Sequence, residues 1–144
     1  MKAIAVVDKN LAIGRENSLL FSLPADLKHY KEETLGKVVI MGRKTVEGLP
    51  GKKPLPGRTT VVVSRSIPLP EIPDDAIVCG GAQVYAMFWD RTDYLIMTEV
   101  EAEAEGADAF FPDYRDGSFT CVKDSGEIED NGFKYHIREY KRNA

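Results

Sequence analysis

Four short apolar segments constrain the fold of this chain more than any other feature. Each is rich in β-branched residues and shows little polar alternation. The four segments are KAIAVV (2–7), KVVIM (37–41), TTVVVS (59–64) and AIVC (76–79). Strands of this kind are usually buried on both faces, as in a largely parallel sheet that helices cover. We therefore expect an α/β fold.

Helical sequences lie between or after these strands, at about 24–34, 43–48 and 81–89. Further β-rich segments follow, and two of them, 118–124 and 133–141, are separated by a turn region that contains Gly and Asn. This arrangement predicts a C-terminal antiparallel pair of strands. The expected architecture is thus a central, mostly parallel, twisted sheet with an antiparallel hairpin at its C-terminal edge.

The composition suits a single globular domain that spans residues 1–144. The chain is 43% hydrophobic, enough for a sizeable core, and its net charge is −4. A mildly acidic chain argues against general binding to nucleic acid or to a membrane surface. The apolar segments are too short to span a bilayer, and the N-terminus predicts a first strand rather than a signal peptide. We therefore expect a cytoplasmic protein.

The spacing of cysteines and histidines predicts neither a disulfide nor a metal site. Cys79 and Cys121 form no spacing motif, and His29 and His136 are too far apart for a zinc pattern. In a reducing cytoplasm both thiols are expected to be free. We expect no bound metal.

Two strand-to-helix turns could bind phosphate groups. VVIMGRKTVEG (38–48) passes from a strand through a glycine to a basic helix start, and AIVCGGAQVYAMF (76–88) passes through a Gly-Gly pair. Helix N-termini offer unpaired N–H groups, and glycine lets the backbone approach a ligand closely. Arg43 and Lys44 strengthen the first case. Neither turn matches the fingerprint G-x-G-x-x-G, and a tight turn without a ligand is the alternative at each position.

Three charged residues also have two possible interpretations. Asp26, in SLLFSLPADLKHY (18–30), is either a first-turn acid that suits the helix dipole or a carboxylate held in an apolar pocket to handle a proton. Arg58, after a Pro-Gly turn, could clamp a substrate carboxylate, and Arg65 at a strand end could bind a phosphate. A solvated arginine is the alternative at both positions.

Taken together and in this order, several motifs resemble the dihydrofolate reductase family. They are AIGRENSLL (12–20), SLPADLKHYK (22–31), VVIMGRKT (38–45), KPLPGRTTVVVSR (53–65), IVCGGAQVY (77–85) and YLIMTEVEAEAEGADAFFPDY (94–114). The resemblance implies a three-layer fold with helices on both faces of the sheet. It also implies the NADPH-dependent reduction of 7,8-dihydrofolate to 5,6,7,8-tetrahydrofolate, with a hydride transferred to C6 and a proton to N5.

The resemblance implies a role for each residue that matches a family motif. The catalytic set is Leu19, Phe21, Asp26, Tyr85 and Thr98. Asp26 would bind the 2-amino group and N3 of the pterin and promote protonation of N5 through water, and Thr98 would partner the carboxylate. Substrate would contact Ile4, Ala5, Val6, Asp26, Leu27, Tyr30, Lys31, Leu49, Leu55, Arg58, Cys79 and Thr98. NADPH would contact Val6, Ile13, Gly14, Asn17, Ser18, Leu19, Gly42, Arg43, Lys44, Thr45, Val63, Ser64, Arg65, Cys79, Gly80, Gly81, Ala82, Gln83, Val84, Tyr85 and Met87.

The family further implies a cis peptide between Gly80 and Gly81. It also implies a mobile loop, AIGRENSLLFS (12–22), that closes over the nicotinamide, with Asp108 supporting the closed state.

Some residues depart from the family pattern. Phe21 stands where the family nearly always has Trp, whose N–H holds a water beside the pterin, and Phe has no such donor. Cys79 replaces a usual aliphatic residue, and Met87 stands where a polar residue often contacts adenine. The family's additional strand and helix after 61–66 are missing, and only the proline-rich IPLPEIPDD (67–75) remains. We expect an exposed loop there, a smaller sheet edge and a more open adenine pocket.

The departures leave two alternative functions open. One is a related NADPH-dependent reductase of another pterin or of a pyrimidine intermediate. The other is a weakly active NADPH- or folate-binding protein. The expected partners are dihydrofolate and antifolate inhibitors, without nucleic acid or membrane, and the expected state is a monomer.

Overall fold

The computed structural model describes residues 1–14, 20–21, 23–49, 56–63 and 72–144. The helices of this part of the chain are α1 (Pro24–Thr34), α2 (Arg43–Glu47), α3 (Ala82–Met87) and the 3-10 helix η2 (Trp89–Arg91). The strands are β1 (Lys2–Val7), β2 (Ala12–Gly14), β3 (Val38–Gly42), β4 (Thr59–Val63), β5 (Ile77–Gly80), β6 (Tyr94–Val100), β7 (Ala109–Phe110), β8 (Phe119–Asp124), β9 (Ile128–Asp130) and β10 (Phe133–Arg142).

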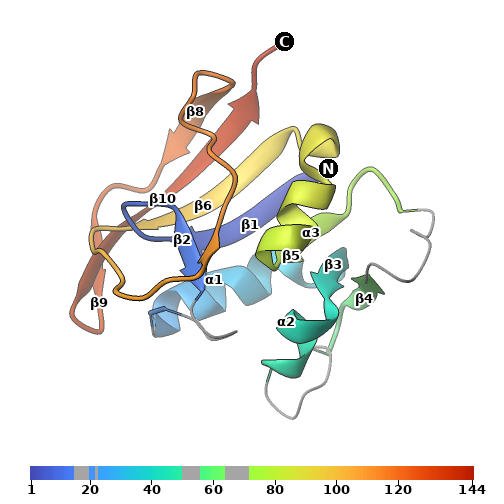
Figure 1. Ribbon diagram of the computed structural model, residues 1–144, viewed down its shortest axis with the longest axis horizontal. Coiled ribbons are helices and arrows are strands. Elements are labelled where there is room, and N and C mark those ends of the chain that lie inside the picture. Colours follow the sequence, from blue (N-terminus) through green and yellow to red (C-terminus); the bar gives the residue numbers. More distant parts are fainter. Residues whose placement is uncertain (15–19, 22, 50–55, 64–71) are drawn as a thin grey trace.

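A mixed, twisted sheet forms the centre of the protein (Figure 1). Its strand order is β4-β3-β5-β1-β6-β10-β8, and β9 pairs with β10. In this order, β4, β3, β5, β1 and β6 run parallel to one another. Strand β10 is antiparallel to β6, β8 and β9. Because β3 and β5 are adjacent parallel strands, α2 and α3 begin at the same edge of the sheet. Ligands of open α/β sheets bind at this kind of edge.

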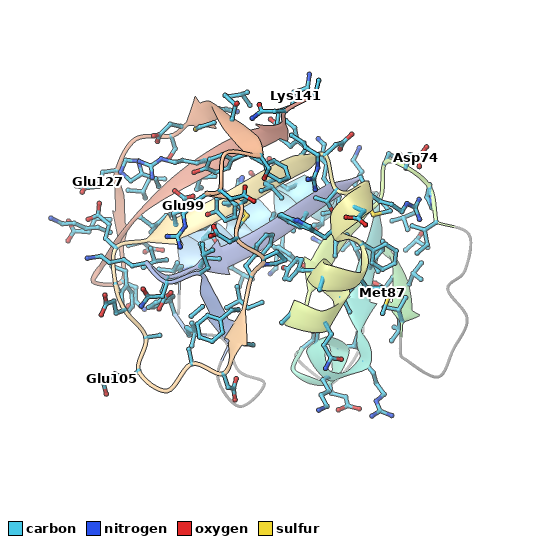
Figure 2. The ribbon with its side chains drawn as sticks, turned by 45° about the horizontal axis from the view of Figure 1, so that its top comes forward. Asp74, Met87, Glu99, Glu105, Glu127 and Lys141 are labelled. Carbon is cyan, nitrogen blue, oxygen red and sulfur yellow. The ribbon has the colours of Figure 1, made fainter. Side chains whose placement is uncertain are left out.

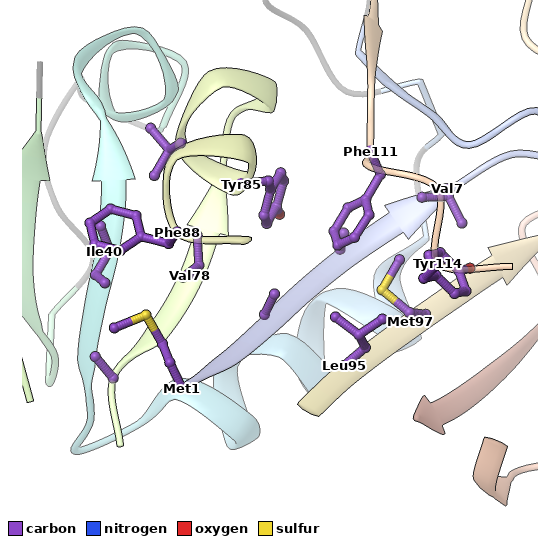
Figure 3. Close-up of a cluster of buried hydrophobic side chains, with 14 of the residues drawn as sticks. Met1, Val7, Ile40, Val78, Tyr85, Phe88, Leu95, Met97, Phe111 and Tyr114 are labelled. Atoms are coloured by element: carbon purple, nitrogen blue, oxygen red, sulfur yellow. The ribbon is translucent and has the colours of Figure 1, made fainter. Parts of the chain in front are cut away.

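The two faces of the sheet carry separate apolar clusters because side chains alternate along each strand. Ala3 and Ala5 of β1 belong to one of these clusters, which also contains Tyr85 of α3 and Phe88 (Figure 3). Ile4, between them, belongs to the cluster on the other face, which includes Tyr30 of α1. Helices thus cover both faces of the sheet, and the predicted α/β fold is confirmed.

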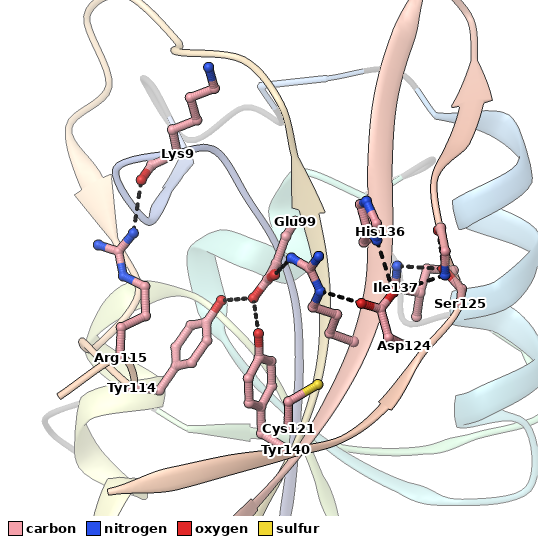
Figure 4. Close-up of polar contacts among 12 residues, drawn as sticks. Lys9, Glu99, Tyr114, Arg115, Cys121, Asp124, Ser125, His136, Ile137 and Tyr140 are labelled. Carbon is pink, nitrogen blue, oxygen red and sulfur yellow. Dashed lines mark hydrogen bonds and ion pairs between the residues drawn. The ribbon is translucent and has the colours of Figure 1, made fainter. Parts of the chain in front are cut away.

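A polar network holds the antiparallel side of the sheet together (Figure 4). The Glu99 carboxylate on β6 accepts hydrogen bonds of 2.6 Å from the hydroxyls of Tyr114 and Tyr140, and one of 2.7 Å from Arg138. Arg138 also donates to Asp124 on β8 at 2.8 Å. Burial, reinforced by the Glu99 carboxylate, raises the pKa of both tyrosines, so their hydroxyls remain donors at neutral pH. The network connects β6, β8 and β10 through side chains.

Most elements agree with the sequence-based expectations, within a few residues at their ends. The C-terminal hairpin forms between β8 and β10, and Cys79 and Cys121 are free thiols. The helix expected at 81–89 ends at Met87, and a separate 3-10 turn follows it. The short strands β2, β7 and β9 were not predicted. Residues 72–76 of the chain contain neither helix nor strand, whereas 67–71 lie outside the described residues.

No helix among the described residues is long and apolar enough to cross a bilayer. Likewise, these residues contain no group of three or more His, Cys, Asp or Glu side chains that could hold a metal ion.

We predict that Leu95→Ala lowers the free energy of unfolding by about 2–5 kcal/mol, the usual effect of a cavity in a close-packed core. Leu95 is fully buried on β6. The matched control is Leu35→Ala, because the side chain of Leu35 is 61% exposed. Urea denaturation should show a change within about 1 kcal/mol for this control. Equal losses in the two variants would contradict the assignment of Leu95 to the core.

Candidate active site

Asp26 is a buried acid in the first turn of α1. Pro24 occupies the start of the helix, where its missing N–H is not needed. Asp26 is 5% exposed, and its Oδ1 accepts a hydrogen bond of 2.6 Å from the hydroxyl of Thr98. Thr98 lies on β6 directly beside Val6 of β1. The carboxylate is therefore held over the middle of the sheet and does not extend from a solvated helix face.

A second acid fixes the N-terminus of the same helix. The residue at the N-cap, Leu23, has no side chain that can accept a hydrogen bond. Instead, Oδ2 of Asp130 on β9 accepts the backbone N–H of Ala25 at 2.9 Å. Sequence reasoning missed this contact, because the two residues are 105 positions apart and no local motif connects them.

The apolar side of this region is built around Phe21. Its ring packs edge-to-face against Phe133 of β10, with the centroids 5.1 Å apart. Both rings join a cluster with Leu23, Val6 and Ile137. The phenyl ring thus supplies apolar contact beside the helix that carries the buried acid.

Tyr85 and Cys79 pack in the apolar clusters on the two faces of the sheet. The Tyr85 hydroxyl on α3 donates a hydrogen bond of 2.5 Å to the carbonyl of Ile4, and burial raises the pKa of Tyr85 well above its usual value. Burial also raises the pKa of the Cys79 thiol to about 12. Cys79 is therefore a neutral thiol that packs and does not act as a nucleophile.

Arg58 is held rigidly between the end of α1 and the start of β4. Its Nε donates to Thr34 Oγ1 at 2.9 Å, and its two terminal nitrogens donate to the carbonyls of Pro56, at 2.5 Å, and Lys31, at 2.9 Å. A guanidinium has five N–H donors, so one remains on each terminal nitrogen. This pair of donors matches the geometry of a carboxylate.

Glycines allow close packing where β3 and β5 meet the helices that follow them. A Cβ atom on Gly42 would lie 3.1 Å from Val84 Cγ2, and one on Gly81 would lie 3.3 Å from Thr45 Oγ1. The cis peptide between Gly80 and Gly81 is confirmed. The first helix start carries the exposed Arg43, whose Nε lies 3.7 Å from Glu47 Oε1. Two backbone turns with little side-chain bulk thus face the same edge of the sheet.

The remaining predicted residues fall into three groups. Ala5 and Val6 lie on the central strand, and Leu49 packs against the apolar cluster below α1. Leu27, Lys31, Gln83 and Met87 are exposed side chains on α1 and α3 (Figure 2 shows Met87). Asn17, Ser18, Leu19, Leu55, Ser64 and Arg65 lie outside the described residues, as does much of the expected adenine pocket.

The expected mobile loop begins in a small separate sheet. Ile13 and Gly14 lie on β2, which pairs with β7. The backbone N–H of Asp108 donates to the Gly14 carbonyl at 3.1 Å, and that of Phe111 donates to the Leu11 carbonyl at 2.8 Å. The segment that contains Asp108 is thus tied to the first residues of this loop.

Comparison with known proteins relates the whole chain to one family. A family model described as dihydrofolate reductase matches residues 1–71 and 66–142. Dihydrofolate reductase type 3 of Salmonella typhimurium is 40% identical, over 77% of each chain. Dihydrofolate reductase of Bacillus subtilis (strain 168) is 33% identical, over 96% of this chain and 92% of the relative. Among solved structures, dihydrofolate reductase from Enterococcus faecalis complexed with NADP(H) and RAB-propyl has a TM-score of 0.84 at 29% identity, covering 99% of this chain and 96% of that one.

We predict that Thr98→Val lowers the free energy of unfolding by about 1–3 kcal/mol, because a buried carboxylate loses its hydrogen-bond donor while the side-chain volume stays the same. Thr120→Val is the control. Thr120 also donates to an oxygen, Asn143 Oδ1 at 2.6 Å, but it is exposed. Urea denaturation of both variants measures the difference. Similar small losses in both would show that the Thr98 hydroxyl contributes no more than a solvated one.

Proposed function

Because this chain belongs to the dihydrofolate reductase family, we propose that Asp26 directs the proton in the reaction of that family. The enzyme reduces 7,8-dihydrofolate to 5,6,7,8-tetrahydrofolate. When bound, NADPH supplies the hydride that reaches C6 of the pterin. The observation that carries the proposal is the burial of Asp26 together with its short hydrogen bond from Thr98.

Asp26 has room for further hydrogen bonds. A carboxylate can accept about four, and Thr98 occupies one position on Oδ1. The free positions suit two N–H donors side by side, such as the 2-amino group and N3 of a pterin. Binding the pterin in this way orients the ring and promotes protonation of N5 through water. Tyr85 supports the same site by fixing the backbone of Ile4 next to the ring.

Phe21 keeps the pocket apolar without a hydrogen-bond donor. Its contact with Phe133 holds the ring in place, and exclusion of bulk water strengthens the electrostatic interactions of the nearby carboxylate. The water that delivers the proton is therefore held by polar groups other than the side chain at position 21.

The aryl and glutamate parts of the substrate extend along α1. We assign the aminobenzoyl ring to Leu27, Tyr30, Leu49 and Leu55, and the α-carboxylate to Arg58 with Lys31 close by. Leu27 is 51% exposed, a high value for an apolar helix residue that a bound ring would cover. A carboxylate site at this end favours folate over a pterin or pyrimidine that lacks a glutamate tail.

The residues at the carboxyl edge of the sheet fit a dinucleotide. Gly42 and Gly81 allow close packing at the starts of α2 and α3, where the first backbone N–H groups of a helix have no partner within the helix. We assign the phosphates to the two turns, Gly42–Thr45 and Gly80–Val84, and the 2′-phosphate to Ser64 and Arg65. We assign the adenine side to Val63 and Met87. We assign the nicotinamide end to Val6, Ile13, Gly14, Asn17, Ser18, Leu19, Cys79 and Tyr85.

We further propose that antifolates bind in the pterin pocket, and that the enzyme acts as a monomer in the cytoplasm.

For the proton role, we predict that Asp26→Asn lowers turnover at neutral pH by roughly 10² to 10⁴, the usual contribution of a positioned proton-transfer group. The loss should shrink at low pH, where solvent protonates the substrate directly. Loss of NADPH absorbance with dihydrofolate, followed across the pH range, measures both effects. A loss that stays constant with pH would count against the proton role.

For the glutamate tail, we predict that Arg58→Lys raises KM for dihydrofolate by about 10- to 100-fold, because a paired, charge-assisted contact becomes a single one. The turnover number should change little, since Arg58 lies far from the reacting atoms along α1. Dihydropteroate, which has no glutamate, is the matched control substrate. Its KM should be unaffected, and an equal rise for both substrates would refute the assignment of Arg58 to the tail.

A further inference from the structure

His29 lies beside Asp26 on the same face of α1. Its Nδ1 is 3.6 Å from Oδ1 of Asp26, and its Nε2 is 3.4 Å from Oε1 of Glu33. Residues spaced by three and four positions along a helix are neighbours on its surface. The imidazole therefore lies between a buried carboxylate and a half-exposed one, and its own side chain is 22% exposed.

Other elements also place negative charge near this imidazole. From β10, Glu139 contributes to the field at His29. From β6, the Tyr94 hydroxyl donates to Glu139 at 2.7 Å, and from β8, Lys123 Nζ lies 3.5 Å from the same carboxylate. Tyr135 of β10, near Asp26, adds no charge, since burial and the nearby carboxylates raise the pKa of a hydroxyl that is already neutral at neutral pH. Among the described residues that face His29, carboxylates thus outnumber cations.

These surroundings favour the charged form of the ring. The pKa of His29 is raised above its usual value, chiefly by the interaction with Asp26 and further by Glu33 and Glu139, although partial burial opposes the shift. At this separation, a charged imidazolium attracts the adjacent Asp26 carboxylate. Since 3.6 Å exceeds the length of a direct hydrogen bond, the coupling between the two side chains is electrostatic.

We propose that His29 is a positioning residue for the reductase reaction, which holds the Asp26 carboxylate in its ionised form while Glu33 orients the ring. This inference rests on the role of Asp26 proposed above. It adds a cation beside an acid whose neighbour at position 21 provides no hydrogen-bond donor. Because the two charges interact, the pH dependence of the reaction belongs to the pair and not to one residue.

The first experiment compares pH profiles of variants with and without a charge at position 29. In His29→Gln, the carboxylate loses its cation and binds a proton more readily. The pH midpoint of turnover should therefore rise by about one unit. This is the smallest shift that an opposite charge at such a distance usually causes in the pKa of a carboxyl group. His29→Lys retains a charge and should return the midpoint toward the wild-type value. Lys28→Gln, which removes a charge from the exposed neighbouring position, is the control and should leave the midpoint unchanged.

The second experiment tests the pair without relying on turnover. NMR titration of the two histidines should show that Asp26→Asn lowers the midpoint of His29, while His136, which pairs with Asp124, serves as an internal control. An unchanged His29 midpoint would overturn the coupling. If the titration shows coupling but the pH profile of His29→Gln matches that of the wild type, the proposed role of His29 in the reaction would be overturned. Absence of dihydrofolate turnover in the wild type would refute the proposed function instead, and the titration would still decide whether the pair is coupled.

Discussion

The attachment of helix α1 to the sheet is the interaction on which the rest of the site depends. The fully buried residues of this helix are both polar, Asp26 and Thr34. Asp26 is fixed by Thr98 of β6, Thr34 by Arg58 at the start of β4, and the helix N-terminus by Asp130 of β9. Hydrogen bonds have narrower geometry than apolar contacts, so they determine the position of the helix more sharply. We assign the pterin and much of the aryl ring to residues of this helix, and Arg58, which we assign to the substrate tail, is hydrogen-bonded to its C-terminal end.

These contacts serve two purposes at once. The Asp26 carboxylate attaches the helix to the sheet, and it is also the group assigned to the proton. Arg58 connects α1 to β4 with three of its donors and has two left for a ligand. A substrate therefore meets groups that folding has already ordered, and binding requires little further loss of side-chain freedom. Stability and activity cannot be changed independently at these positions.

The sequence predicted those features that depend on local patterns. Apolar β-branched segments such as 37–41 became buried parallel strands, and the Gly-Gly turn became the junction of β5 and α3. The strands β2, β7 and β9 were not predictable because they have only two or three residues, too few to show alternation. The cap from Asp130 depends on tertiary placement alone. His29 is different, since its spacing of three residues from Asp26 and four from Glu33 is visible in the sequence.

The family motifs carried more information about the site than the spacing did. Spacing left Asp26, Arg58 and the two glycine turns each with two interpretations. The structure adds that Asp26 is buried and that three hydrogen bonds order the Arg58 guanidinium, whereas the roles of both residues toward a ligand stay predictions. Burial and hydrogen bonds of this kind depend on contacts between distant segments, which cannot be inferred from a single sequence.

The central position of β1 has a consequence for how the protein folds. Its parallel neighbours are β5 and β6, in which Ile77 and Tyr94 pair with Lys2. Both partners lie more than 70 residues further along the chain. During synthesis at about 5–20 residues per second, this apolar strand leaves the ribosome roughly 5–20 s before its second partner does. Contacts of such long sequence separation also make folding slow. This strand is thus exposed to aggregation and to chaperones until the middle of the sheet exists.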